Sequence, residues 1–77
     1  MEKLVQQITK IMAEVMGVDP EKINENTSRT TLPEWDSFNH LLFISEVEKV
    51  LNVSFTVEEV AKTSSFKELC TLVSKKK

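Results

Sequence analysis

The stretch LPEWDSFNHLLFISEVEKVL, residues 32–51, combines a helix start with a long helical period. Asp36 and Ser37 both suit the N-terminal cap of a helix, and Pro33 lies just upstream, where it does not interrupt one. The apolar residues that follow form a wide stripe on a helix. The members of this stripe are Phe38, Leu41, Phe43, Ile44, Val47, Val50 and Leu51. We therefore predict a helix from residue 36 or 37 to residue 51.

A second periodic segment lies at the N-terminus, over residues 2–16. Its apolar residues share one helical face, and they are Leu4, Ile8, Ile11, Met12 and Val15. Gly17 follows the last of them and is a natural helix terminator. The spacing predicts a helix that ends at residue 16.

Two capping boxes mark two more helix starts. In Thr56-Val57-Glu58-Glu59 and in Ser65-Phe66-Lys67-Glu68, a hydroxyl residue is followed three positions later by a glutamate, so each can satisfy the other's backbone donor. The first box opens a helix of barely two turns that ends near Lys62. The second opens the last helix, whose apolar residues are Phe66, Leu69, Cys70 and Val73.

The connection over residues 18–35 is long for a compact domain, and such loops are often functional. Asp19-Pro20-Glu21 fits a cap, a proline at the first helical position and an acidic first turn, which predicts a short helical turn near Ile23. The polar run over residues 24–29 is predicted as loop. The apolar residues expected to pin the connection to the core are Ile23, Leu32 and Trp35.

These elements predict an all-α protein: a small four-helix bundle with a long first loop and a short third helix. The 77 residues, 1–77, are expected to form a single domain with a thin core. The sequence contains no internal repeat, glycine-rich loop or metal-ligand cluster.

Composition excludes several classes of protein. The net charge is −2, with −4 over residues 1–52 and +2 over residues 53–77. The positive charge of the C-terminal part comes mainly from Lys75, Lys76 and Lys77. We interpret these lysines as a solvated tail rather than as the basic stripe of a nucleic-acid binder. No apolar run is long enough for a signal peptide or a membrane span, so a cytoplasmic location is expected.

No catalytic constellation is predicted. His40 is the single histidine and Cys70 the single cysteine, and they fall in different predicted helices. We expect His40 on the surface, one turn into its helix, and Cys70 in the core as a small hydrophobe. No metal site and no acid–base pair are predicted.

Ser37 has two interpretations that its position alone does not separate. A serine at a helix start is most often a cap. The same place also suits a phosphodiester on the hydroxyl, because the free N–H groups and the dipole of a helix N-terminus favour an anion. Asp36 is an alternative cap, which would leave the Ser37 hydroxyl pointing outward.

The stretch Leu32-Pro33-Glu34-Trp35-Asp36-Ser37-Phe38 resembles the prosthetic-group site of acyl carrier proteins, which is built around Asp-Ser-Leu at the start of their second helix. Residues 16–23, 46–51 and 66–69 resemble the family's first turn, the close of its second helix and the opening of its last. The likeness covers nearly the whole chain. A bare Asp-Ser pair is a weak signal, but at this position and with this helix order it is a specific one.

The resemblance implies a carrier that is not an enzyme. By it, Ser37 bears a covalent 4′-phosphopantetheine arm, which a phosphopantetheinyl transferase attaches from coenzyme A. The arm's thiol then holds an acyl or aminoacyl group as a thioester. The other expected partners are enzymes that activate and transfer such groups, and the chain is expected to be a monomer. Members of the family sometimes shelter an acyl chain among their helices, and the candidate wall residues here are Met12, Leu41 and Ile44.

Two departures from the family pattern lie next to Ser37. Phe38 replaces the usual leucine, and we expect this bulkier anchor to pack inward. Trp35 stands where many members have a small residue, and Trp-Asp-Ser resembles free-standing carriers outside primary fatty-acid synthesis.

The predicted second helix also differs from its counterparts in charge. Carriers of primary fatty-acid synthesis show an acidic face there, whereas polar, apolar and basic residues dilute it here. Leu42 is the best candidate for an apolar contact. We expect partners that depend less on basic patches, since charge complementarity sets partner choice and association rate. The residues expected to meet partners are Asp36, Asn39, His40, Leu42, Glu46 and Lys49.

The resulting hypothesis is a carrier of acyl groups in a specialised pathway, such as secondary-metabolite or cell-envelope synthesis. A D-alanyl or peptidyl-type carrier of aminoacyl groups is an alternative. Another is an unmodified helical protein–protein interaction module in which Ser37 is only a cap. A DNA-binding domain is disfavoured, because the predicted second helix has a single basic residue, Lys49, apart from its histidine.

Overall fold

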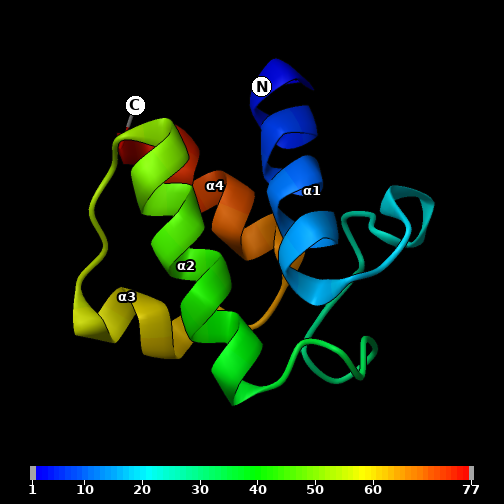
Figure 1. Ribbon diagram of the computed structural model, residues 1–77. Helices are drawn as coiled ribbons and strands as arrows, with labels where there is room; N and C mark the ends of the chain where they lie inside the picture. Colours follow the sequence, from blue (N-terminus) through cyan, green and yellow to red (C-terminus); the bar gives the residue numbers. More distant parts are fainter. Residues whose placement is uncertain (1, 77) are drawn as a thin grey trace.

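The structure is a computed structural model that describes residues 2–76, and these residues form helices joined by loops (Figure 1). The elements are α1 (Glu2–Met16), the 3₁₀ turn η1 (Pro20–Lys22), α2 (Ser37–Leu51), α3 (Val57–Lys62) and α4 (Phe66–Lys76). The predicted all-α fold, with its long first loop and short third helix, is confirmed. So are the predicted short turn before Ile23 and the predicted ends of the helices.

Both long helices end at a residue in the left-handed region of backbone conformation. Gly17, with φ of 69°, ends α1, and its N–H donates to the carbonyl of Ala13 over 2.9 Å. Asn52, with φ of 55°, ends α2, and its N–H donates to the carbonyl of Glu48. Glycine and asparagine reach this conformation at lower cost than other residues, so the sequence itself places both helix ends.

The core lies where α1 packs against α2 and α4. The bulkiest fully buried side chains come from these helices and from Trp35, two residues before α2. They are Trp35, Phe43, Ile8, Met12, Leu69, Val47 and Val73. Ile23 and Leu32 are also buried, which confirms that apolar residues pin the long connection to the bundle.

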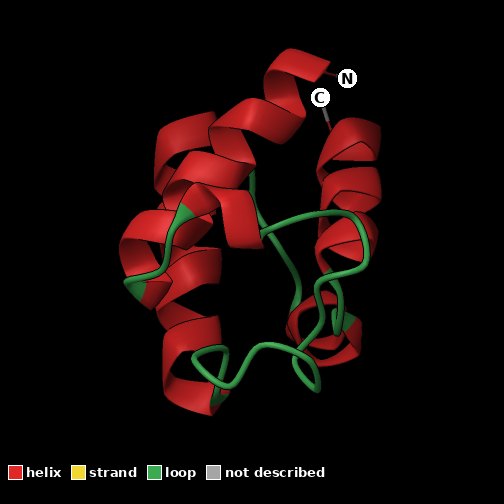
Figure 2. Ribbon diagram, turned by 90° about the vertical axis from the view of Figure 1, so that its right-hand side faces the viewer, coloured by secondary structure: helices red, strands yellow, loops and turns green. Residues whose placement is uncertain are grey.

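The long connection runs over the side of the molecule that faces the viewer in Figure 2, and backbone hydrogen bonds join it to the start of α4. Ser28 and Ser65 form an isolated antiparallel bridge. The N–H of Arg29 donates to the carbonyl of Ser64 over 3.0 Å, and the N–H of Phe66 donates to the carbonyl of Thr27 over 2.8 Å. The polar run that was predicted only as loop is therefore held in place by backbone hydrogen bonds at residues 27–29.

α3 lies beside the N-terminal half of α2 and buries none of its own residues (Figure 1). The predicted capping box is present, with Glu59 N–H donating to Thr56 Oγ1 and Thr56 N–H donating to Glu59 Oε1. Lys76 Nζ lies 2.8 Å from Glu59 Oε1 and 5.5 Å from the ring centroid of Phe55. The expectation of a solvated basic tail is therefore wrong for Lys76, while Lys77 lies outside the described residues.

Candidate functional site

Asp36, and not Ser37, caps α2. The backbone of Asp36 is extended, and its Oδ1 accepts a hydrogen bond from the N–H of Asn39 over 2.8 Å. Ser37 is the first residue of the helix, and its side chain is exposed. The structure thus resolves the question that position alone left open, because the capping role is filled by the residue before the serine.

Within residues 2–76, one cationic side chain is hydrogen-bonded to the Ser37 hydroxyl. Arg29 Nη2 donates to Ser37 Oγ over 3.2 Å. Arg29 reaches this place because the bridge between Ser28 and Ser65 holds the connection against the start of α4. Sequence patterns did not point to Arg29, although it is the single arginine among ten basic residues.

His40 is buried, so the expectation of a surface histidine is wrong. Its Nδ1 accepts a hydrogen bond from Trp35 Nε1 over 2.9 Å, and its Nε2 lies 2.9 Å from the carbonyl oxygen of Val60. An indole N–H only donates and a carbonyl only accepts, so His40 is neutral with its hydrogen on Nε2. The ring connects the residue before the cap, α2 and α3, and it does not belong to the exposed face of α2.

Lowering the pH from about 7 to about 5 is expected to reduce the free energy of unfolding. Burial lowers the pKa of His40 below its ordinary value of 6.5, the Val60 carbonyl opposes this shift and the charge of Arg29 adds to it. The unfolded chain therefore binds more protons in this window, and stability present above pH 6.5 is lost as the pH falls toward the folded-state pKa. Protonation would also place a hydrogen on Nδ1, against the indole N–H. Urea unfolding at the two pH values measures the effect.

The control for this prediction is His40→Gln, which has no titrating ring. Its stability is expected to be lower than that of the wild type at pH 7 but nearly constant over the same interval. An equally steep loss of stability in this variant would assign the pH dependence to other groups.

Three apolar side chains lie exposed on α2 directly after Ser37. Phe38 is 70% exposed, Leu41 61% and Leu42 43%. The prediction that Phe38 packs inward is wrong, because Phe43, Ile44 and Val47 fill the core side of the helix. Leu41 is exposed and lines a groove between α2 and α3 together with Ile44, while Met12 and Ile44 are buried as expected. Leu42, the predicted apolar contact, is available at the surface.

The other residues predicted to meet partners fall into two groups. Glu46 and Lys49 are exposed on α2. Asp36 and Asn39 take part in the hydrogen bonds at the start of α2. Asp36 Oδ1 accepts from the Asn39 N–H, and Asn39 Nδ2 donates to the carbonyl of Glu34 over 2.8 Å. These residues remain predicted contacts, with the exception of the buried His40.

Two of the three carboxylates at the start of α2 and along it accept hydrogen bonds from backbone N–H groups. Glu48 Oε2 accepts a hydrogen bond from the N–H of Phe55 over 2.9 Å, and Asp36 caps the helix. Glu46 is the remaining carboxylate on α2, and it lies beside Leu42 and Val50 in a groove shared with α1. Glu46 is exposed and Glu48 is half-buried, so Glu46 is the α2 carboxylate most accessible to a partner.

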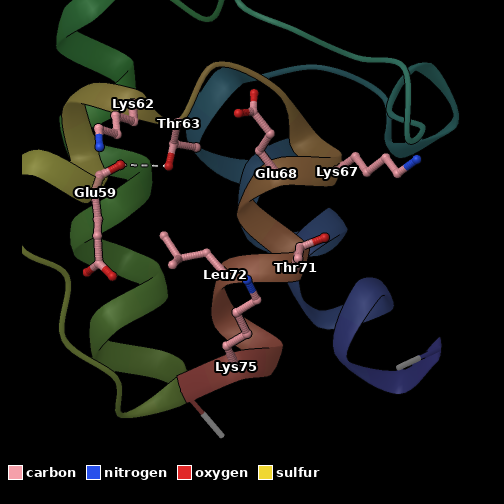
Figure 3. A pocket seen from close by; sticks show the side chains of 8 residues that line it. All are labelled: Glu59, Lys62, Thr63, Lys67, Glu68, Thr71, Leu72 and Lys75. Atoms are coloured by element: carbon pink, nitrogen blue, oxygen red, sulfur yellow. Dashed lines mark hydrogen bonds between the residues drawn. The ribbon is translucent and has the colours of Figure 1, made fainter.

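A separate groove lies between α3 and α4 (Figure 3). Leu72 points into it, and lysines from both helices surround it together with Glu59 and Glu68. The groove contains neither Ser37 nor Arg29 among its lining residues, so it is not part of the site at the start of α2.

Cys70 is buried in the core, as predicted, and burial raises the pKa of its thiol to about 11. A thiol with this pKa is almost entirely protonated at neutral pH, and the thiolate is the nucleophilic form. Cys70 is therefore unsuited to attack a thioester. In the described part of the chain, no group of three or more possible ligands is arranged to hold a metal ion.

The residues around Ser37 fit a covalently attached phosphodiester. The hydroxyl is exposed, a guanidinium lies beside it, and the first N–H groups of α2 have no carbonyl partner within the helix. An all-α bundle that presents such a serine at the start of its second helix has the features of a carrier domain.

Comparisons with known proteins define the family. The model of the family "phosphopantetheine attachment site" matches residues 6–73, and the chain belongs to this family. The chain is a carrier of the acyl carrier protein type. The cofactor of this family is covalently attached 4′-phosphopantetheine, and its members carry cargo rather than catalyse reactions. Such carriers interact with acyl-handling enzymes.

One similar solved structure is that of an acyl carrier protein from Thermotoga maritima. It superimposes with a TM-score of 0.83 at 28% sequence identity, over 97% of this chain and 87% of that one. The search of curated proteins finds no match. Among the described residues, no helix is both long and apolar enough to cross a membrane.

Proposed function

We propose that this chain carries its 4′-phosphopantetheine arm on Ser37 and holds acyl groups on it as thioesters. The observation that supports this most directly is the separation of roles at the start of α2. Asp36 caps the helix, so the exposed hydroxyl of Ser37 is not needed as the cap. A phosphopantetheinyl transferase would therefore modify a residue that does not cap the helix.

Electrostatics at the start of α2 also support Ser37 as the attachment residue. A phosphodiester on Ser37 would lie at the positive end of the helix dipole, where anions are stabilised. The arm supplies the thiol that bears the cargo. The protein residues fix where the arm begins, and the exposed α2 face supplies the contact surface for partner enzymes.

We propose further that the cargo is acyl and that the pathway is specialised. Trp35 is fully buried and hydrogen-bonded to His40, so the departure from the family pattern at this position is part of the core. The exposed side chains of α2 nearest to Ser37 are apolar, and they are Phe38, Leu41 and Leu42. This surface suits partners whose contacts are apolar rather than basic. A monomeric state and a cytoplasmic location remain predictions.

Intact-mass measurement tests the carrier proposal. The purified protein is incubated with coenzyme A and a broad-specificity transferase, and the product is fragmented to locate the added group. We expect one added phosphopantetheine per chain, on Ser37. A chain that gains no mass would support the unmodified interaction module instead, and modification at another serine would overturn the assignment to Ser37.

The cargo needs a separate measurement. Mass spectrometry of the thiol-bound species, isolated from the native host, identifies the group on the arm. An acyl group is expected. An aminoacyl group would support a D-alanyl or peptidyl-type carrier and overturn the choice of cargo, while leaving the carrier function intact.

A further inference from the structure

We propose that Arg29 is a binding residue for the phosphodiester of the prosthetic group, holding it at the start of α2. This inference rests on the proposed attachment to Ser37. Its basis is the hydrogen bond of 3.2 Å from Arg29 Nη2 to Ser37 Oγ. The oxygen that accepts this bond is the one that would become the ester oxygen of the arm.

The chemistry of the two groups is complementary. After attachment, the phosphorus is bonded directly to Ser37 Oγ, so the two non-bridging oxygens, which share the single negative charge of the phosphodiester, lie two bonds from the atom that Arg29 already contacts. A guanidinium presents several N–H donors in one plane and binds phosphate oxygens in pairs. An arginine beside this hydroxyl therefore needs only a small side-chain adjustment to bind the anion.

Arg29 is positioned by its backbone and not by a competing acid. Its N–H donates to the carbonyl of Ser64, next to the bridge between Ser28 and Ser65. Within residues 2–76, no carboxylate lies within ion-pair distance of its guanidinium. The charge is therefore available, and the segment that carries it is ordered by long-range contacts before any ligand is attached.

The negative charge of the neighbouring cap, Asp36, gives the positive charge of Arg29 a role in the loaded protein. The Asp36 carboxylate precedes Ser37 and is held at the helix start by its bond to the Asn39 N–H. A phosphodiester on Ser37 adds a second negative charge beside it, and like charges at close range destabilise the folded state. Arg29 offsets this repulsion, so loading of the wild-type protein should cost little stability.

The test compares apo and loaded forms of four proteins: the wild type, Arg29→Gln, Arg29→Lys and the control Lys22→Gln. Lys22 is exposed in η1, so the control removes one positive charge from the same long connection. The Arg29 variants keep the backbone N–H that bonds Ser64. All four are loaded with coenzyme A and a transferase, and intact mass confirms complete loading.

We expect loading to change the melting temperature of the wild type and of Lys22→Gln equally. In Arg29→Gln, the change in melting temperature on loading should be about 3 °C more negative than in the wild type. Arg29→Lys should fall between them, because it keeps the charge and loses the paired donors. In the wild type, the NMR resonance of the Arg29 side-chain N–H should also move on loading, and its exchange with water should slow.

The outcomes separate the two proposals. If loading shifts the melting temperature of Arg29→Gln and of the wild type equally, and the Arg29 resonance does not move, the role of Arg29 is overturned while attachment to Ser37 stands. If the wild type gains no phosphopantetheine, or gains it on a residue other than Ser37, both proposals fail.

Discussion

Replacing Ser37 with alanine is expected to abolish phosphopantetheine loading completely while leaving the free energy of unfolding within about 0.5 kcal/mol of the wild type. The variant has no hydroxyl at the start of α2 to form the phosphodiester. Its stability is preserved because Asp36 Oδ1 still accepts from the Asn39 N–H. Intact mass after incubation with transferase and coenzyme A measures the first effect, and urea unfolding measures the second.

Two variants serve as controls for this prediction. Ser45→Ala removes another exposed hydroxyl of α2 and is expected to load as the wild type does. Asp36→Ala removes the cap and is expected to lose about 1 kcal/mol of stability. If Ser37→Ala lost that stability and Asp36→Ala did not, Ser37 would be the functional cap in solution.

Replacing Trp35 with alanine is expected to destabilise the fold by about 3–5 kcal/mol. A chain of this length has a total stability of about 4–12 kcal/mol, so the variant would be largely unfolded if the wild type lies at the lower end of this range. Trp35 is 1% exposed, donates to His40 Nδ1 and meets the Phe43 ring edge-on, with ring centroids 5.9 Å apart. Far-UV circular dichroism in urea measures the loss, since the variant has no tryptophan fluorescence.

Trp35→Phe separates the two contributions of this side chain. It keeps most of the apolar volume and removes the indole N–H, which leaves His40 Nδ1 without its donor. An unpaired buried acceptor costs about 1–3 kcal/mol, so the loss should be smaller than in Trp35→Ala. Equal losses in the two variants would mean that the hydrogen bond, and not the packing of the ring, dominates.

Much of the fold was predictable because its signals are local. Gly17 and the Thr56 capping box act within a few residues of their own position, and the helices they bound were predicted at the observed residues. The start of α2 was predicted to within one residue. Only the division of roles between Asp36 and Ser37 needed the structure, because both residue types suit a cap.

The errors concern contacts between segments far apart in the chain. His40 was expected on the surface, but its partners are the Val60 carbonyl on α3 and the indole before α2. Phe38 was expected in the core, yet a helical stripe this wide cannot all face inward, and the bundle buries the side with Phe43 and Val47. Arg29 was missed because the bridge that positions it joins two serines, whose pairing has no sequence signature.

The bridge between Ser28 and Ser65 has a consequence for the order in which the chain acquires its structure. The two residues are separated by almost half of the sequence, so the bridge cannot form until the ribosome has added residues 64–66. By then α1, α2 and α3 have already been synthesised. Closing so long a loop costs chain entropy, which favours late formation during folding. The neighbourhood of Ser37 is therefore completed only after α2 and α3 have been made, and a newly made chain lacks it until α4 begins.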